Sequence, residues 1–105
     1  METPIATKRL TAQWTDGTRH DVCVQIWPPT PDGRMFRCRI TTKGLQPEYD
    51  PPSIGGFDEM QAITLSLSFV RFLFEEHLRQ GGSLYYPSPE SDVPYSPHDL
   101  PPATS

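Results

Sequence analysis

The sequence predicts an α+β fold: an antiparallel three- to four-stranded β-meander with one long α-helix packed on one face, followed by a proline-rich C-terminal tail. Three observations lead to this fold class. Segments in the first half of the chain alternate apolar and polar residues with a period of two, as half-buried strands do. One helical stretch with signals at both ends follows them. The 105 residues suffice for one compact domain and are too few for two.

The first three strands are predicted at residues 5–14, 20–27 and 35–42. In each of them three alternate residues are apolar, so that one face of the sheet meets a core and the other meets water. The dipeptide Asp16-Gly17 and the segment 28–33 separate the strands and are typical of turns. The inward-facing set is Leu10, Ala12, Trp14, Val22, Val24, Ile26, Phe36, Cys38 and Ile40.

The turn between the first two strands can be predicted from the direction of the side chains. A two-residue turn at Asp16-Gly17 would place the apolar set of one strand beside the polar set of the other, because a slip of one residue turns every side chain over. A three-residue loop with Gly17 in the left-handed conformation restores the agreement and pairs Ala12 with Val22. We therefore expect the longer, bulged loop.

The same alternation bears on the two cysteines. If Val24 faces Cys38, then Cys38 points inward and Cys23 points outward beside Arg39. A direct disulfide would need both side chains on one face at a suitable separation. We expect two free thiols.

The long helix is predicted to begin after Asp58 and to end at Gly81. Asp58 and the glutamine three positions later match a capping box, and glycine suits the left-handed conformation that ends a helix. Residues 43–57 form the loop that leads to the helix; a loop of this length in a small domain is often functional or a crossover.

The chain after the helix is divided into a strand and a tail. Residues 83–86 are predicted to return to the sheet as a fourth strand, which Pro87 ends. The single α+β domain is therefore expected to cover residues 1–86. Residues 87–105 are acidic and rich in proline, and such a segment alone buries too little surface to offset its chain entropy. This tail could also order against Arg37 and Arg39, or dock into a partner.

The apolar residues of the helix cover about two-thirds of its circumference, against the ~100° stripe that a surface helix needs. They form two groups, one around Ile63 and one that contains Leu65, Phe69 and Phe72. One sheet covers one group, and the second group left in water would form a patch large enough to attract a partner. The sequence leaves three possibilities for what covers the second group: a second copy of this chain, a different protein, or the chain's own proline-rich segments.

No catalytic residue, cofactor site or metal ligand is predicted. His20, His77 and His98 do not have the spacing of a metal site. His77 lies between the two apolar groups of the helix, where a hydrogen-bonded structural histidine is favoured over a catalytic base. The pairs Gly55-Gly56 and Gly81-Gly82 lack the lysine and the pattern of a phosphate-binding loop.

The net charge of −4 is unevenly distributed. Residues 1–43 carry seven basic and four acidic side chains, whereas residues 44–105 carry two basic and nine acidic ones. Either solvated charges are segregated by chance, or an acidic half faces a cationic partner. For the second interpretation the predicted contact residues are Glu48, Tyr49, Asp50, Glu90, Asp92 and Tyr95. An acidic chain also makes binding to nucleic acid unfavourable, because attraction to phosphates needs concentrated positive charge.

The sequence contains no run of about 18 apolar residues that could span a membrane. Its first ten residues lack the apolar segment of a secretory signal. Two cysteines in a chain of this length do not make a disulfide scaffold. We therefore expect a cytoplasmic protein.

The outward face of the predicted sheet is basic and carries one aromatic side chain. Arginine and an aromatic residue on a flat sheet can stack bases of single-stranded RNA, bind an acidic protein surface, or form a solvated face. All three interpretations are kept, with the solvated face favoured. The outward-facing set is Arg9, Gln13, Gln25, Trp27, Arg37 and Arg39.

The segment from Gly56 to Tyr86 resembles a small uncharacterised bacterial family. The shared pattern is G-x-D-x-x-Q-A at residues 56–62, then a leucine-rich helix, then G-G-x-L-Y-aromatic at residues 81–86. The resemblance implies a bacterial α+β domain and supplies no catalytic residues. Small acidic proteins of this kind often occur as immunity proteins beside bacterial toxins, which is an association and not an inference from the residues.

The function expected from these observations is binding without catalysis. The most specific hypothesis is an inhibitor or immunity-type protein that neutralises a cationic toxin or effector. A second hypothesis is a homodimeric structural or regulatory domain with Leu65, Phe69 and Phe72 at the two-fold axis. A third is a small enzyme or ligand-binding domain with a pocket between helix and sheet near His77.

Overall fold

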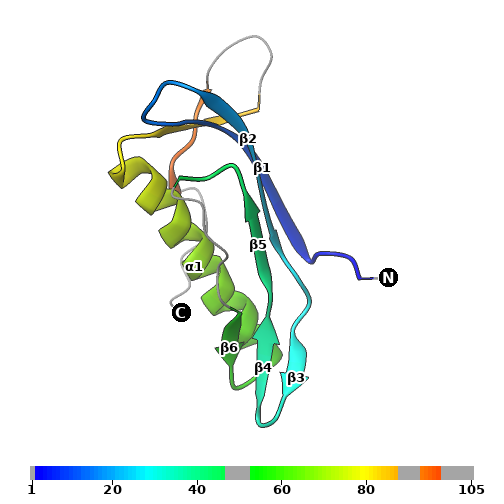
Figure 1. Ribbon diagram of the computed structural model, residues 1–105. Coiled ribbons are helices and arrows are strands. Elements are labelled where there is room, and N and C mark those ends of the chain that lie inside the picture. The colour runs from blue at the N-terminus through cyan, green and yellow to red at the C-terminus, as the bar shows by residue number, and fades with distance from the viewer. Residues whose placement is uncertain (1, 47–52, 88–92, 98–105) are drawn as a thin grey trace.

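Two antiparallel sheets and one long helix make up the part of the chain that this computed structural model describes, residues 2–46, 53–87 and 93–97 (Figure 1). The larger sheet has the strand order β5-β2-β1-β7-β8 and the smaller one the order β3-β4-β6. The predicted α+β class is thus confirmed. The elements are β1 (Ala6–Gln13), β2 (Arg19–Ile26), β3 (Thr30–Asp32), β4 (Met35–Cys38), β5 (Ile40–Lys43), β6 (Ile54–Gly56), α1 (Glu59–Arg79), β7 (Ser83–Tyr86) and β8 (Val93–Pro94).

Strands β1 and β2 are joined by the predicted three-residue loop. Gly17 has a φ of 86°, and the Trp14 N–H donates to the Thr18 carbonyl at 2.8 Å. The predicted register is wrong by two residues, because Ala12 lies opposite His20 and not opposite Val22. A shift of two residues keeps every side chain on its face, so the inward set is the predicted one.

The predicted strand at 35–42 is divided between the two sheets as β4 and β5. The break lies opposite Pro28 and Pro29, which have no N–H to donate to a strand ladder. Between the pairs Ile26–Ile40 and Thr30–Arg37, one side of the hairpin has three residues and the other has two. The extra residue makes a bulge, and bulges bend a strand and re-aim its side chains.

The division of this strand changes the neighbours of both cysteines. Val24 lies opposite Thr42 and not Cys38, and Cys23 lies opposite Lys43 and not beside Arg39. The directions are as predicted, because Cys38 is fully buried and Cys23 is half-buried. Both thiols are free.

Helix α1 begins at the predicted cap. The Gln61 N–H donates to Oδ1 of Asp58 at 2.7 Å, and Oε1 of Gln61 accepts from the Phe57 N–H at 2.6 Å. Gly56 makes the last strand before the helix pass close to its first turn, because a Cβ at Gly56 would lie 2.5 Å from the Ala62 nitrogen. Strand β6, in the loop expected at 43–57, was not predicted.

The sheets cover the arc of α1 that lies between the two predicted apolar groups. The core centres on this arc, where the helix meets β2, β4, β6 and β7. Members of both groups therefore flank the core, and neither group is covered as a unit. The buried residues of the helix are Ala62, Ser66, Val70, Leu73, Phe74 and His77.

The chain after Pro87 contributes to the fold as well. Strand β8 pairs with β7, which the composition of the tail did not predict. Tyr95 is 4 % exposed, and its ring packs edge-on against Phe74 and Tyr86 at centroid distances of 5.6 and 5.2 Å. Part of the proline-rich segment thus packs on the helix at Phe74. It does not cover the second apolar group, in which Leu65 and Phe72 stay exposed. Among the described residues, no helix is long and apolar enough to cross a membrane.

Candidate functional site

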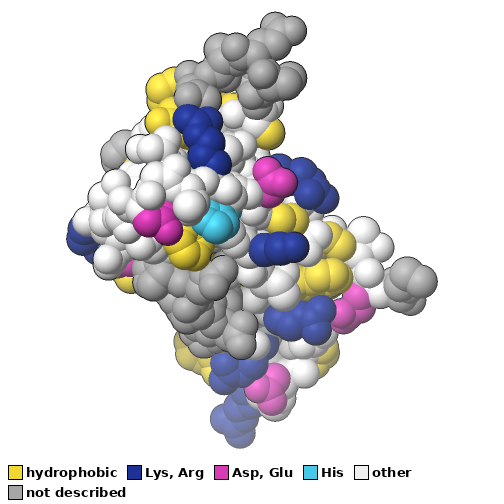
Figure 2. All heavy atoms as spheres, turned by 45° about the horizontal axis from the view of Figure 1, so that its top comes forward, with side chains coloured by type: hydrophobic (Ala, Val, Ile, Leu, Met, Phe, Trp, Pro, Cys, Tyr) yellow, Lys and Arg dark blue, Asp and Glu magenta, His cyan; other side chains and the backbone are white. Residues whose placement is uncertain are grey.

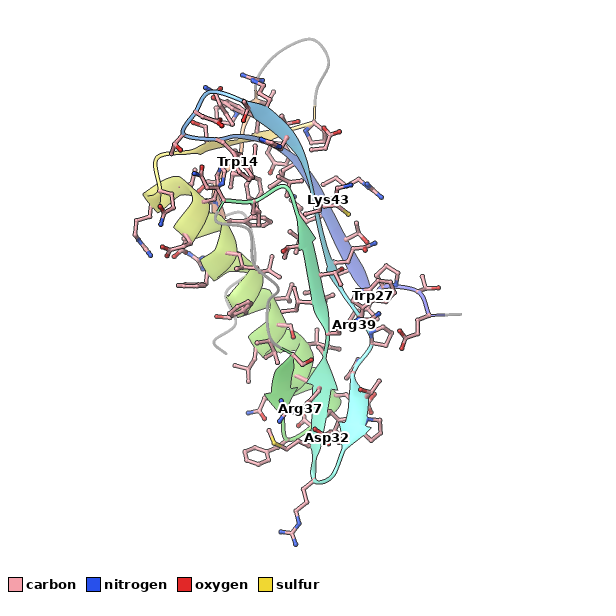
Figure 3. All side chains as sticks on the ribbon, viewed as in Figure 1. Trp14, Trp27, Asp32, Arg37, Arg39 and Lys43 are labelled. Carbon is pink, nitrogen blue, oxygen red and sulfur yellow. The ribbon has the colours of Figure 1, made fainter. Side chains whose placement is uncertain are left out.

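Three cationic side chains and Trp27 lie on the outer face of the hairpin formed by β2 to β5 (Figure 3). Arg37 lies in β4, Arg39 lies in the break between β4 and β5, and Lys43 ends β5. Cys38 and Ile40, on either side of Arg39, are buried, so Arg39 points away from the core. All three are exposed. In Figure 2, Lys and Arg side chains form a broken row down one face of the molecule, with Asp or Glu side chains beside several of them.

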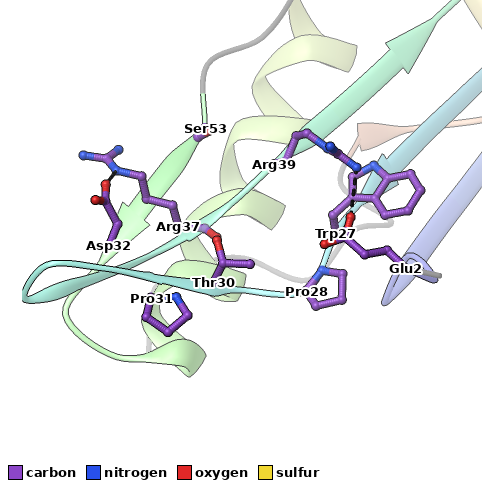
Figure 4. Close-up of a pocket in the computed structure, with 9 residues that line it drawn as sticks. All are labelled: Glu2, Trp27, Pro28, Thr30, Pro31, Asp32, Arg37, Arg39 and Ser53. Carbon is purple, nitrogen blue, oxygen red and sulfur yellow. Dashed lines mark hydrogen bonds and ion pairs between the residues drawn. The ribbon is translucent and has the colours of Figure 1, made fainter.

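A pocket of about 380 Å³ lies where the bulge separates the two sheets (Figure 4). It is of the size that holds a small ligand or a few side chains of a partner. Pro28, one of the two prolines opposite the break, forms part of its apolar wall together with Pro31. The residues that line it are Glu2, Trp27, Pro28, Thr30, Pro31, Asp32, Arg37, Arg39 and Ser53.

Trp27 and Arg39 are held together by contacts across the hairpin. The guanidinium carbon of Arg39 lies 4.7 Å from the centroid of the Trp27 ring, within the range of a cation–π interaction. The Trp27 N–H donates to the Arg39 carbonyl at 2.9 Å, and the indole N–H donates to Oγ1 of Thr41 at 3.1 Å. The ring is therefore fixed in orientation before any ligand arrives.

Each arginine of the pocket has an acidic neighbour. Nε of Arg37 lies 2.6 Å from Oδ2 of Asp32, and Nη2 of Arg39 lies 3.3 Å from Oε2 of Glu2. The four side chains are between 43 % and 60 % exposed. Exposed ion pairs contribute only about 0–1 kcal/mol, so a carboxylate of a ligand can replace either acidic neighbour at low cost.

The chemistry that this pocket offers is anion binding. Guanidinium groups bind carboxylates and phosphates through paired hydrogen bonds. No histidine or cysteine is among the described residues that line it, and its hydroxyls belong to Thr30 and Ser53. The described ranges also contain no group of three or more His, Cys, Asp or Glu side chains that could hold a metal ion.

His77 is a structural residue in the described part of the chain. Its side chain is fully buried, Nδ1 accepts from the Gln46 N–H at 3.0 Å, and Nε2 lies 3.2 Å from the carbonyls of Gln13 and Ser83. One nitrogen accepts and the other donates, so the ring is neutral, and burial lowers its pKa. This histidine ties α1 to β1, β7 and the chain after β5, as the structural interpretation predicted.

Most of the predicted partner-binding residues lie outside the described ranges. Glu48, Tyr49, Asp50, Glu90 and Asp92 are in this class, and the prediction for them stays a prediction. Tyr95 is described and lies in the core between Phe74 and Tyr86. Its ring is therefore not on the surface of this conformation.

The three predicted interface residues of the helix differ in exposure. Leu65 is 41 % and Phe72 is 44 % exposed, whereas Phe69 is half-buried. The rings of Phe69 and Phe72 lie 5.9 Å apart between centroids. The structure thus brings these side chains together at the side of the helix that flanks the core.

The charge of the described part differs from that of the whole chain. All nine Lys and Arg residues are described, whereas five of the thirteen acidic residues are not, so the described part has nine positive and eight negative side chains.

The pocket itself was not predicted from the sequence, although its Trp and Arg residues were placed on the outer face. The signal that could have found it is Pro28-Pro29 directly after Trp27.

A family model described as "Domain of unknown function (DUF6968)" matches residues 6–96, from the first residue of β1 to just beyond Tyr95. No curated protein and no solved structure matches the chain.

Proposed function

The chain belongs to this domain family, and from that premise we propose that it is a non-catalytic protein-binding domain. In this proposal the pocket around Trp27, Arg37 and Arg39 holds carboxylates of a partner protein. The observation that carries it is the pair of arginines on one outer face, with the guanidinium of Arg39 already placed over the indole ring of Trp27. A fixed guanidinium loses less conformational freedom on binding than a mobile one.

A protein segment suits this surface better than a small anion. The positive charge continues beyond the pocket to Lys43, which lies four residues, or about 13 Å, along the strand from Arg39. A small anion reaches only one end of this row, whereas an extended acidic segment reaches both. Nucleic acid is disfavoured because the whole chain carries a net charge of −4.

Within this class we propose an inhibitor or immunity-type role, in which the domain neutralises its partner by covering part of its surface. A small domain with its charged groups on a rigid sheet is suited to this task, because complementary charge speeds encounter and fixes orientation. The acidic residues predicted to contact a cationic partner, such as Glu48 and Asp50, would form a second contact of opposite sign. That contact is proposed separately and is tested separately below.

A charge-reversal experiment tests the role of the pocket. Wild-type protein and the R37E/R39E double variant are used as baits in the source cells, with cross-linking and quantitative mass spectrometry of the captured proteins. We expect a specific partner to be lost from R37E/R39E and retained by the control R34E/R79E, which makes the same change in net charge away from the pocket. Equal capture by all baits would contradict the proposal.

A second candidate function is a homodimeric structural or regulatory domain. It is supported by the exposure of Leu65 and Phe72 beside Phe69 on one side of α1. Apolar side chains of this size on a helix surface are a common basis for association between copies. Light scattering over a range of concentrations distinguishes a dimer from a monomer.

A further inference from the structure

The ladder between β1 and β7 stops halfway along β1. Strand β7 pairs with Thr11–Gln13 only. The next residue of β1 whose backbone groups point towards the side of β7 is Arg9. In the same register Arg9 would lie opposite Pro87, which has no N–H to donate. Strand β7 accordingly ends at Tyr86. On this side no described strand pairs with Ala6–Arg9, although β2 pairs with them on the other side.

The pattern of the β1–β2 ladder identifies the backbone groups that face the open edge. Trp14 and Thr18 form a hydrogen-bonded pair at the loop, and such pairs recur at every second residue of an antiparallel ladder. The even-numbered residues of β1 therefore bond to β2. The N–H and C=O groups of Thr7 and Arg9 point the other way, towards the open edge.

A small apolar pocket lies on the inner side of this edge. Its volume is about 100 Å³, which is room for one branched aliphatic side chain. It opens between the first half of β1 and the face of α1 that carries Leu67 and Val70. The amine of Lys8 is held 5.0 Å from the ring centroid of Tyr86 and 4.8 Å from that of Tyr95. The lining residues are Ala6, Thr7, Lys8, Val24, Ile26, Leu67 and Val70.

We propose that the open edge of β1 is a strand-addition site for an extended segment of a partner protein. The segment bonds to the free backbone groups of Thr7 and Arg9. Its alternate side chains divide between the two faces, as in other complexes that add a strand to a sheet. The inward side chains are aliphatic and fill the pocket, and the outward ones are acidic and lie beside Arg9. This site is separate from the pocket around Trp27 and goes beyond the proposed function.

The charge of the edge argues for a partner and against a second copy of the chain. Residues 5–9 contain two cations and no acidic residue. A second copy would bring the same two cations to the junction, whereas an acidic segment neutralises them. Lys8 also faces inward at an open edge, and inward-facing charges are a common means of preventing sheets of identical chains from joining.

A synthetic peptide tests the proposal without knowledge of the partner. The probe is acetyl-Thr-Glu-Val-Glu-Val-Glu-Thr-amide, whose valines can fill the pocket while its glutamates lie on the outer face. The readout is the titration of backbone amide shifts by NMR. We expect the largest changes at the amides of Thr7 and Arg9, and we expect them to persist in R37E/R39E, which removes the other anion-binding site.

Matched variants separate strand addition from simple charge attraction. Methylation of the central glutamate nitrogen removes a bond to β1 and should weaken binding at least tenfold, whereas methylation of a valine nitrogen, which points away, should not. T7P removes an N–H that no described residue accepts, and it should weaken binding to a similar extent, whereas T7V keeps this N–H and should bind as the wild type does.

Three results would overturn the proposal. The first is unchanged amide shifts at Thr7 and Arg9 with excess peptide. The second is equal affinity for the two methylated peptides, a result that does not depend on whether T7P folds. The third is a wild-type dimer in light scattering that T7P converts to a monomer, which would assign the edge to a second copy. If the peptide does not bind R37E/R39E and the amide shifts of Thr7 and Arg9 do not change, the peptide binds at the Trp27 pocket instead.

Discussion

The backbone N–H of Gln46 donates a hydrogen bond of 3.0 Å to Nδ1 of His77, which joins the chain after β5 to the last turns of α1. The bond exists only while the ring is neutral, because a protonated imidazole has no acceptor. Protonation of a single buried side chain therefore opposes the contact between α1 and the chain after β5.

The stability of the domain should fall as the pH is lowered below about 6.5, the pKa of histidine in an unfolded chain. Burial lowers the pKa of His77 in the folded state, so the unfolded state binds more protons in this range. The contribution of neutral His77 to the free energy of unfolding is thus complete above about pH 6.5, and it is lost as the pH falls towards the pKa of His77 in the folded state. Urea unfolding from pH 8 to pH 5 measures it. The variant H77Q should be less stable at pH 8 and should depend less on pH; parallel curves for both proteins would contradict the assignment.

Two adjacent glycines should respond differently to alanine. A Cβ at Gly56 would lie 2.5 Å from the backbone nitrogen of Ala62, whereas at Gly55 its nearest neighbour is the terminal methyl of Met35 at 2.9 Å. Backbone cannot move aside cheaply and the end of a methionine can. We expect G56A to lower the free energy of unfolding by about 1–3 kcal/mol and G55A to lower it much less. Thermal and urea unfolding check both, and an equal loss would argue against the close contact of β6 with α1.

Tyr95 should be required for the stability of the domain although it lies in the predicted tail. Its ring packs against Phe74 and Tyr86, and removing a buried aromatic side chain costs about 3 kcal/mol. We expect Y95A to lose about this much stability. The control V93A alters a side chain that is 45 % exposed and should change stability little. If both variants unfold like the wild type, the segment 93–97 does not pack as described.

The two proposed contacts of opposite sign can be separated by reversing their charges. E48K/D50K should weaken binding of a cationic partner, whereas R37E/R39E should weaken binding of an acidic one, because like charges across an interface oppose association. Affinity for the captured partner is measured by calorimetry at two salt concentrations. Unchanged affinity in E48K/D50K removes the predicted acidic contact and leaves the arginine pocket untouched.

Acidic substitutions on the exposed side of α1 test whether two copies of the chain associate. If Leu65 and Phe72 lie at a two-fold axis, L65E/F72E should convert a dimer to a monomer in light scattering without loss of helix in circular dichroism. Their exposure of 41 % and 44 % makes the folded monomer tolerant of the change. A wild-type protein that stays monomeric at every concentration would rule out the homodimer.

The fold class, the first loop and the helix cap could be predicted because each depends on residues close together in the sequence. Alternation fixes the face of a side chain in a strand and says nothing of which residue lies opposite, so the pairing of Ala12 was wrong by two while its burial was right. The capping box at Asp58 is local in the same sense.

The features that were missed depend on contacts between distant parts of the chain. The split of the third strand comes from Pro28-Pro29 on the opposite side of the hairpin. Strand β8 follows a proline-rich stretch whose composition predicts a tail, and it forms because Tyr95 fills space beside Phe74. The site around Trp27 follows from the split strand, so it could not be predicted until the split was known.

The contact of Lys8 with Tyr95 bears on how the protein is made in the cell. Lys8 lies in the first strand of the larger sheet and Tyr95 directly follows the last one, so nearly the whole domain must leave the ribosome before they can meet. Contacts between such distant residues slow folding. A nascent chain that stops before Tyr95 leaves Phe74 uncovered, and an exposed aromatic surface of this kind favours capture by chaperones or proteases. The core around Phe74 is therefore closed only after nearly the whole domain has been synthesised.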